Sequence, residues 1–169
     1  ILADLMTIRE YKGSFDGLKM CFIGDGNNMM NSLIVGGLKV GMEVAVACPE
    51  GYRPPQEILD FAAGYDGFTL TDDPMAAAKD ADVVITDVWT SMGQEEERAA
   101  REKAFAGYCI DEKIMGVAKS DAIVQHCLPA HRGEEITEEV FEANAGPIFD
   151  EAENRLHAQK AVMVTLMKD

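Results

Sequence analysis

Three short segments of the chain combine polar, thiol and glycine residues in patterns that packing alone does not require. They are residues 24–28 (GDGNN), 87–94 (DVWTSMGQ) and 126–133 (HCLPAHRG). Each follows or overlaps the end of a short apolar run that predicts a buried β-strand. Carboxylate, amide and thiol groups gathered at one place would bind an α-amino acid and handle a proton of its amine.

The first two segments supply an amide and a carboxylate. Asn27 fits the cap of a following helix, whereas Asn28 exceeds what one cap needs and offers both a donor and an acceptor to an amino-acid head group. Asp87 is the first polar residue after an apolar strand, and the next expected helix starts several residues later. Its carboxylate is therefore predicted to accept hydrogen bonds from a substrate ammonium group.

The rest of the second segment predicts a loop that closes over a ligand. Gly93 supplies a hinge beside Ser91 and Met92, and the charged stretch 95–106 behind it offers little apolar anchorage. Trp89 is left open between a core residue and a platform for ligand.

The third segment places Cys127 next to His126 at the end of a strand. Adjacent strand residues point to opposite faces of a sheet, so this pair cannot act as nucleophile and base in direct contact. Cys127 is predicted to be functional and His126 to be a buried or supporting residue. His131 and Arg132 receive no role.

A cation near the end of the chain points to an anionic ligand. Arg155 is expected in the first turn of a helix that starts at about Glu151, where a positive charge opposes the helix dipole unless an anion is bound. Arg155 is therefore predicted to bind phosphate or carboxylate, with pairing to Glu151 as the alternative.

Glycines 24 and 26 give a G-x-G turn between a strand and a helix, which raises the possibility of a dinucleotide. Met29 stands where the third glycine would be, and the second strand runs into Cys48 and Pro49 without an acidic residue for a ribose hydroxyl. NAD binding is therefore disfavoured.

The elements that must position these residues alternate between strand and helix. Strands are expected at residues 20–23, 43–47, 68–70, 83–86 and 123–126. Helices are expected up to residue 13 and at residues 29–40, 55–64, 74–79, 95–106, 111–119, 137–143 and about 151–168, with Glu97 and Arg101 paired along a solvated face.

This alternation predicts an α/β fold, a doubly wound (Rossmann-like) parallel sheet of about five strands with helices on both faces. In the common doubly wound order, strands one and four are neighbours where the strand order reverses. Ligands bind at the carboxyl ends of the strands near that point, so the three segments should meet over one crevice.

Length and composition fit a single domain over residues 1–169. The 30 acidic and 15 basic residues leave a net charge of −15, which disfavours nucleic acid and anionic membrane as partners. No apolar run approaches the roughly 18 residues of a membrane span.

Four widely spaced cysteines and ten methionines predict neither a zinc site nor a disulfide framework and suit the cytoplasm. Because the chain begins within a helical pattern, we expect it to be a fragment of a longer protein.

Together the segments resemble the ornithine carbamoyltransferases. The matching pieces are residues 1–7 (ILADLMT), 24–28 (GDGNN), 87–96 (DVWTSMGQEE), 126–129 (HCLP) and 149–155 (FDEAENR). The resemblance implies the second, ornithine-binding domain of that family. The family's N-terminal carbamoyl-phosphate domain, with its S-T-R-T and H-P-x-Q segments, is absent from this sequence.

The resemblance also implies the reaction, in which carbamoyl phosphate and L-ornithine give L-citrulline and phosphate. The residues that it assigns to the α-amino and α-carboxylate groups of ornithine are Asn28, Asp87, Ser91 and Met92. Those that it assigns to the δ-amine and carbamoyl phosphate are Cys127, Leu128 and Arg155, with Cys127 and Arg155 as the catalytic pair. Cys127 is interpreted as a proton partner, either a thiolate or a hydrogen-bond acceptor, and not as a nucleophile.

Other functions remain as alternatives. A carbamoyltransferase for another amine, such as putrescine, is disfavoured by Ser91 and Met92, because a diamine has no α-carboxylate for them to bind. A non-catalytic amino-acid-binding module and a nicotinamide-dependent oxidoreductase are the other two. The resemblance implies no metal and no organic cofactor, a full-length homotrimer or larger assembly, and an inactive isolated fragment.

Overall fold

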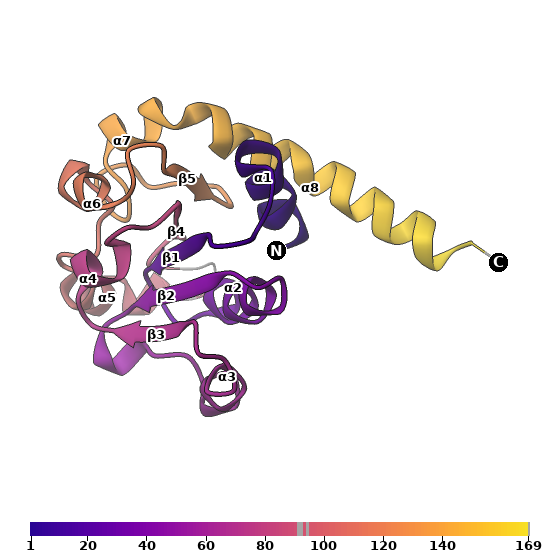
Figure 1. Ribbon diagram of the computed structural model, residues 1–169. Helices are drawn as coiled ribbons and strands as arrows, with labels where there is room; N and C mark the ends of the chain where they lie inside the picture. Colours follow the sequence, from indigo (N-terminus) through magenta and orange to yellow (C-terminus); the bar gives the residue numbers. More distant parts are fainter. Residues whose placement is uncertain (91–92, 94, 169) are drawn as a thin grey trace.

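A five-stranded parallel sheet forms the centre of the computed structural model, which describes residues 1–90, 93 and 95–168. Its strands are β1 (Lys19–Ile23), β2 (Glu43–Ala47), β3 (Phe68–Thr71), β4 (Val83–Thr86) and β5 (Ile123–His126). Their spatial order is β3-β2-β1-β4-β5, so the order reverses between the neighbours β1 and β4. The predicted doubly wound α/β fold is confirmed (Figure 1).

Helices cover both faces of this sheet (Figure 1). They are α1 (Leu2–Lys12), α2 (Asn28–Lys39), α3 (Gln56–Ala62), α4 (Pro74–Ala78), α5 (Arg98–Ala104), α6 (Glu112–Val117), α7 (Glu138–Ala143) and α8 (Ala145–Leu166), with short 3-10 turns η1 (Glu50–Tyr52) and η2 (Glu95–Glu97). Met20 and Phe22 of β1 pack toward α1, α2 and α3, whereas Cys21 and Ile23 pack toward the opposite helices. Strands β1, β2, β4 and β5 are almost wholly buried, as expected where helices cover both faces, whereas the edge strand β3 is partly exposed and alternates apolar and polar residues.

Side-chain caps fix several helix starts where the sequence predicts them. The Asn27 side chain accepts hydrogen bonds from the backbone N–H groups of Met29 and Met30. Asp73 caps α4 ahead of Pro74, and Thr137 caps α7. These short polar residues accept the first free N–H groups of each helix.

Two predicted helices differ from the structure. The stretch predicted as one helix over 95–106 is a 3-10 turn followed by the short α5. The last helix begins at Ala145, six residues before the predicted start, and Arg155 therefore lies ten residues into α8. Pro147 explains the difference, because a proline is well tolerated in a first helical turn.

Helix α8 packs beside α1 and then projects beyond the sheet (Figure 1). Its outer half exposes the large apolar side chains Leu156, Val162, Met163, Val164 and Leu166. Across the described part of the chain, no helix is both long and apolar enough to cross a bilayer.

Candidate active site

A cavity of about 810 Å³ lies at the carboxyl ends of the strands, where a crevice is predicted. Residues of the first and third segments line it, whereas the described residues of the second segment do not. The walls of the cavity come from α1, the start of α2, the turn after β5 and α8. Four of the predicted site residues line it: Asn28, Cys127, Leu128 and Arg155. Ser91 and Met92 lie outside the described residues.

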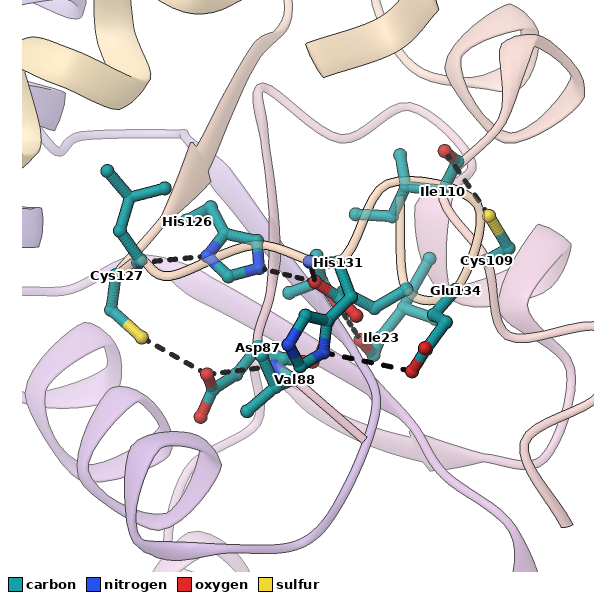
Figure 2. Close-up of polar contacts among 12 residues, drawn as sticks. Ile23, Asp87, Val88, Cys109, Ile110, His126, Cys127, His131 and Glu134 are labelled. Atoms are coloured by element: carbon teal, nitrogen blue, oxygen red, sulfur yellow. Dashed lines mark hydrogen bonds and ion pairs between the residues drawn. The ribbon is translucent and has the colours of Figure 1, made fainter. Parts of the chain in front are cut away.

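Asp87 lies directly behind the thiol of Cys127 and joins all three segments, because it belongs to the second and bonds to residues of the first and the third. The Cys127 Sγ donates to Asp87 Oδ1 at 3.2 Å (Figure 2). Asn27 Nδ2 donates to Asp87 Oδ2 at 3.0 Å. The backbone N–H of Val88 donates to Oδ1 at 2.8 Å. Asp87 is 9% exposed and is absent from the cavity lining, so Cys127 stands between it and the cavity.

The protonation state of Cys127 follows from this environment. Burial, and then the charge of Asp87, raises the pKa of the Cys127 thiol well above its usual range. The thiol therefore stays protonated at neutral pH, which disfavours the thiolate alternative. A neutral thiol that donates to Asp87 keeps its sulfur lone pairs available to a donor in the cavity.

His126 is a buried supporting residue, as predicted from its position on the strand. Its Nδ1 accepts the backbone N–H of Leu128 at 2.9 Å, and its Nε2 lies 3.1 Å from Glu135 Oε1 (Figure 2). Because Nδ1 is an acceptor, the ring proton is on Nε2 and is donated to Glu135. His126 thus orients the backbone of the turn that carries Cys127.

His131 and Arg132 also receive structural roles. The backbone N–H of His131 donates to Glu135, and the Arg132 guanidinium pairs with Glu138 and Glu142. Neither side chain lines the cavity.

Two buried carboxyl groups on the cavity wall escape sequence analysis. Asp4 of α1 and Glu151 of α8 are 2% and 1% exposed, and both line the cavity. Glu151 Oε2 accepts the backbone N–H of His126 at 2.9 Å. Burial, and then the neighbouring Asp4, raises the pKa of Glu151 to about 9. The pair forms only when the two ends of the chain pack together, so no local pattern indicates it.

Glu151 should make this chain less stable as the pH rises. Its pKa rises from 4.5 to about 9 on folding, so between these values the folded chain holds a proton that the unfolded chain releases. Over that window the free energy of unfolding is expected to fall by up to about 1.4 kcal/mol per pH unit from this group. The substitution Glu151→Gln keeps an acceptor for His126 and should flatten the fall.

The measurement is urea unfolding of the chain at pH values from 5 to about 9. Glu153→Gln, an exposed carboxylate on the same helix, is the matched control. Equal pH dependence in the two variants would show that Glu151 is not protonated in the folded chain.

The structure changes the reason for singling out Arg155. Its position ten residues into α8 removes the argument from the first helical turn. Glu151 faces the backbone of His126, so the alternative pairing between Glu151 and Arg155 is not observed. Arg155 is exposed and lines the cavity, and this placement suits an anionic ligand.

The structure decides three expectations for the segment after β4. Trp89 is a core residue, 7% exposed and stacked on Phe105 with ring centroids 5.9 Å apart. The pair of Glu97 and Arg101 forms at 3.0 Å, but Arg101 is 6% exposed, so the predicted solvated face is wrong. Helix α5 is anchored through Arg101 and Phe105, contrary to the expectation of weak anchorage.

One group among the described residues has the donor types of a metal site. Ligand atoms of His131, Glu134 and Glu135 lie within 4.8 Å of one another. Arg98 already pairs with Glu134, and His126 bonds to Glu135. None of the three lines the cavity, so this group is separate from the candidate active site.

Comparison with known proteins agrees with the geometry. The family model for the aspartate/ornithine carbamoyltransferase Asp/Orn binding domain matches residues 16–166. Curated ornithine carbamoyltransferases from Geobacter metallireducens and Methanosarcina acetivorans are 54% and 55% identical over 99% of this chain. The chain spans 56% of the length of each of these relatives.

Solved structures show the same likeness. The anabolic ornithine carbamoyltransferase from Campylobacter jejuni is 44% identical with a TM-score of 0.91, over 97% of this chain and 56% of that one. The ornithine carbamoyltransferase from Pyrococcus furiosus is 49% identical with a TM-score of 0.88, over 95% and 53%. The chain therefore belongs to the aspartate/ornithine carbamoyltransferase family, within its Asp/Orn-binding domain.

Proposed function

We propose that this chain is the ornithine-binding half of an ornithine carbamoyltransferase. The full enzyme would transfer the carbamoyl group of carbamoyl phosphate to the δ-amine of L-ornithine and release L-citrulline and phosphate. The observation that carries the proposal is the cavity that gathers Asn28, Cys127, Leu128 and Arg155, with Asp87 directly behind the thiol.

The charges of the site suit the two substrates. The Asp87 carboxylate lies behind Cys127, where its negative charge favours an ammonium group of ornithine. Asn28 adds an amide that can donate and accept hydrogen bonds. Arg155 offers a guanidinium fork to the phosphate, and Leu128 lies beside it in the cavity wall. We assign Ser91 and Met92 to the α-carboxylate and α-amino groups of ornithine from the family resemblance alone.

Transfer requires that the δ-amine lose its proton before it attacks. In the proposed step the amine nitrogen forms a bond to the carbamoyl carbon, the bond from that carbon to the phosphate oxygen breaks, and phosphate leaves with the electron pair. The δ-ammonium has a solution pKa of roughly 10, so the site must favour its neutral form. The nitrogen thus gives up two protons, one from the ammonium group before attack and one as the new bond forms. Cys127 can accept the first on sulfur while its own proton moves to Asp87 along the 3.2 Å hydrogen bond, and the departing phosphate can take the second. No metal or organic cofactor is required, because phosphate is already a good leaving group.

We propose that a part of the enzyme outside this chain completes the substrate site. The chain spans about 56% of its curated relatives, and the cavity has an apolar wall that includes Leu2, Val162 and Met163. We infer that an N-terminal carbamoyl-phosphate domain covers this wall and that the full enzyme is a homotrimer or larger. Four free cysteines suit a reducing compartment, and we propose the cytoplasm.

The test is citrulline formation by the full-length enzyme that contains this chain, supplied with ornithine and carbamoyl phosphate. We expect turnover with ornithine, little with putrescine, and none from the isolated chain, because the carbamoyl phosphate site is incomplete without the other domain. Preference for putrescine would assign another amine as substrate. Ornithine binding without turnover in the full-length protein would instead indicate a non-catalytic binding module.

A further inference from the structure

One buried cation outside the cavity has no part in the proposed chemistry. Arg101 of α5 is 6% exposed, although the residues on either side of it in the helix, from Arg98 to Ala100 and from Glu102 to Lys103, are exposed. Burying a guanidinium is costly unless its charge and its N–H groups are satisfied. A buried arginine on a short charged helix therefore needs an explanation in its partners.

Those partners come from distant parts of the chain. Nη1 of Arg101 donates to Asp25 Oδ2 at 2.7 Å and to the backbone carbonyl of Trp89 at 3.0 Å. Its Nε donates to Glu97 Oε2 at 3.0 Å, and its guanidinium carbon lies 5.0 Å from the centre of the Tyr52 ring. The planar fork of arginine can make these contacts at once, whereas a lysine ammonium cannot.

Two of these partners belong to segments that carry proposed ornithine-binding residues. Asp25 lies in the turn after β1, two residues before Asn27 and three before Asn28. Trp89 lies two residues after Asp87. Arg101 therefore joins the turn after β1 to the segment after β4 at a place away from the cavity. The bond between Asn27 and Asp87 joins the same two segments next to the cavity.

The turn after β1 is also fixed on its other side. The backbone N–H of Gly26 donates to the carbonyl of Tyr52 at 2.8 Å, and a Cβ on Gly26 would lie 2.5 Å from that oxygen. The turn is thus held between the backbone at Tyr52 and the guanidinium of Arg101. A change at Arg101 would remove one of the contacts that hold the turn in place.

The charge of Arg101 also offsets the repulsion of Asp25 by Asp87. Burial raises the pKa of Asp25, the Arg101 guanidinium opposes that rise, and the charge of Asp87 adds to it. Without the guanidinium, two buried carboxylates would repel each other next to the site. Arg101 does not line the cavity, so any effect on substrate must act through the segments that it holds.

We propose that Arg101, paired with Asp25, is a positioning residue that fixes the two ornithine-binding segments relative to each other and so sets the affinity for the amino-acid substrate. This inference rests on the proposed function. It predicts an effect on ornithine binding that is separate from carbamoyl phosphate binding and from the chemical step.

The test uses steady-state kinetics of the full-length enzyme with Arg101→Lys and Asp25→Asn. We expect each variant to raise the KM for ornithine about tenfold, with kcat within about threefold of wild type and the KM for carbamoyl phosphate unchanged. Because both residues act through one ion pair, the double variant should raise the ornithine KM no further than either single variant. Arg98→Lys, an exposed arginine on the same helix that pairs with Glu102, is the matched control and should change neither KM.

Thermal unfolding of each variant separates positioning from folding. If a variant loses its fold, Tyr52→Leu removes only the ring beneath the guanidinium and should raise the ornithine KM by a smaller factor of about three. A fall in kcat with an unchanged ornithine KM, or an equal rise in both KM values, would overturn the proposal. A wild-type enzyme that makes no citrulline would instead overturn the proposed function.

Discussion

Replacing Asp87 with asparagine in the full-length enzyme that contains this chain is expected to lower kcat/KM for ornithine roughly a thousandfold. Both oxygens of Asp87 accept hydrogen bonds, from Asn27 and from Cys127 and Val88. An asparagine amide would place N–H groups opposite one of these donors and would remove the negative charge that attracts an ammonium group. The lost hydrogen bond and the lost negative charge should both weaken the binding of ornithine.

Steady-state kinetics with each substrate varied in turn would measure this effect. The dissociation constant for carbamoyl phosphate should stay close to that of wild type, because Arg155 and Leu128 are unchanged. Asp121→Asn, which removes an exposed carboxylate paired with Lys12, is the control for loss of one negative charge. Loss of both substrates' binding together would point to misfolding and contradict the assigned role.

Replacing Cys127 with alanine is expected to lower kcat roughly a hundredfold, the usual range for loss of a proton-transfer group. Alanine has neither the lone pairs that accept the amine proton nor the S–H that reaches Asp87 at 3.2 Å. Serine keeps both functions with a shorter side chain, so Cys127→Ser should retain more turnover than Cys127→Ala.

The pH dependence gives the sharper test of Cys127. Burial and Asp87 raise the pKa of the thiol well above its usual range, so the thiol does not ionise near neutral pH. The acid limb of kcat should then follow the δ-ammonium of bound ornithine, and in the alanine variant it should move to higher pH because no group takes up the proton. A profile identical to wild type would remove Cys127 from proton transfer.

Much of the fold could be predicted because local patterns determined it. The strands β2, β4 and β5 have the predicted bounds, since each is built around a short apolar run, residues 44–47, 83–85 and 123–124. The parallel sheet with β1 beside β4 then placed the three segments at one edge. This is why Asn28 and Cys127, far apart in the sequence, were expected on the same cavity.

The features that escaped prediction depend on contacts between distant residues. The spacing of Glu97 and Arg101 indicates a surface pair, but nothing in that spacing shows that Asp25 faces the same guanidinium. Asp4 and Glu151 form a buried pair only because α1 lies beside α8. The predicted start of α8 near Glu151 is six residues too late, because acidic residues typical of a first helical turn follow Ala145, Gly146 and Pro147, which are already helical.

The projection of α8 has a consequence for hydrogen exchange. Its first half includes the buried residues Ile148, Glu151 and Asn154, whereas the described residues from Lys160 onward are all exposed. Amides in the first half can exchange with deuterium only when the packing against α1 opens, but those in the last turns need only fraying of the helix. Deuterium uptake should therefore rise along α8 in this chain, and in the full-length protein the proposed N-terminal domain should protect the outer turns by covering their apolar side chains.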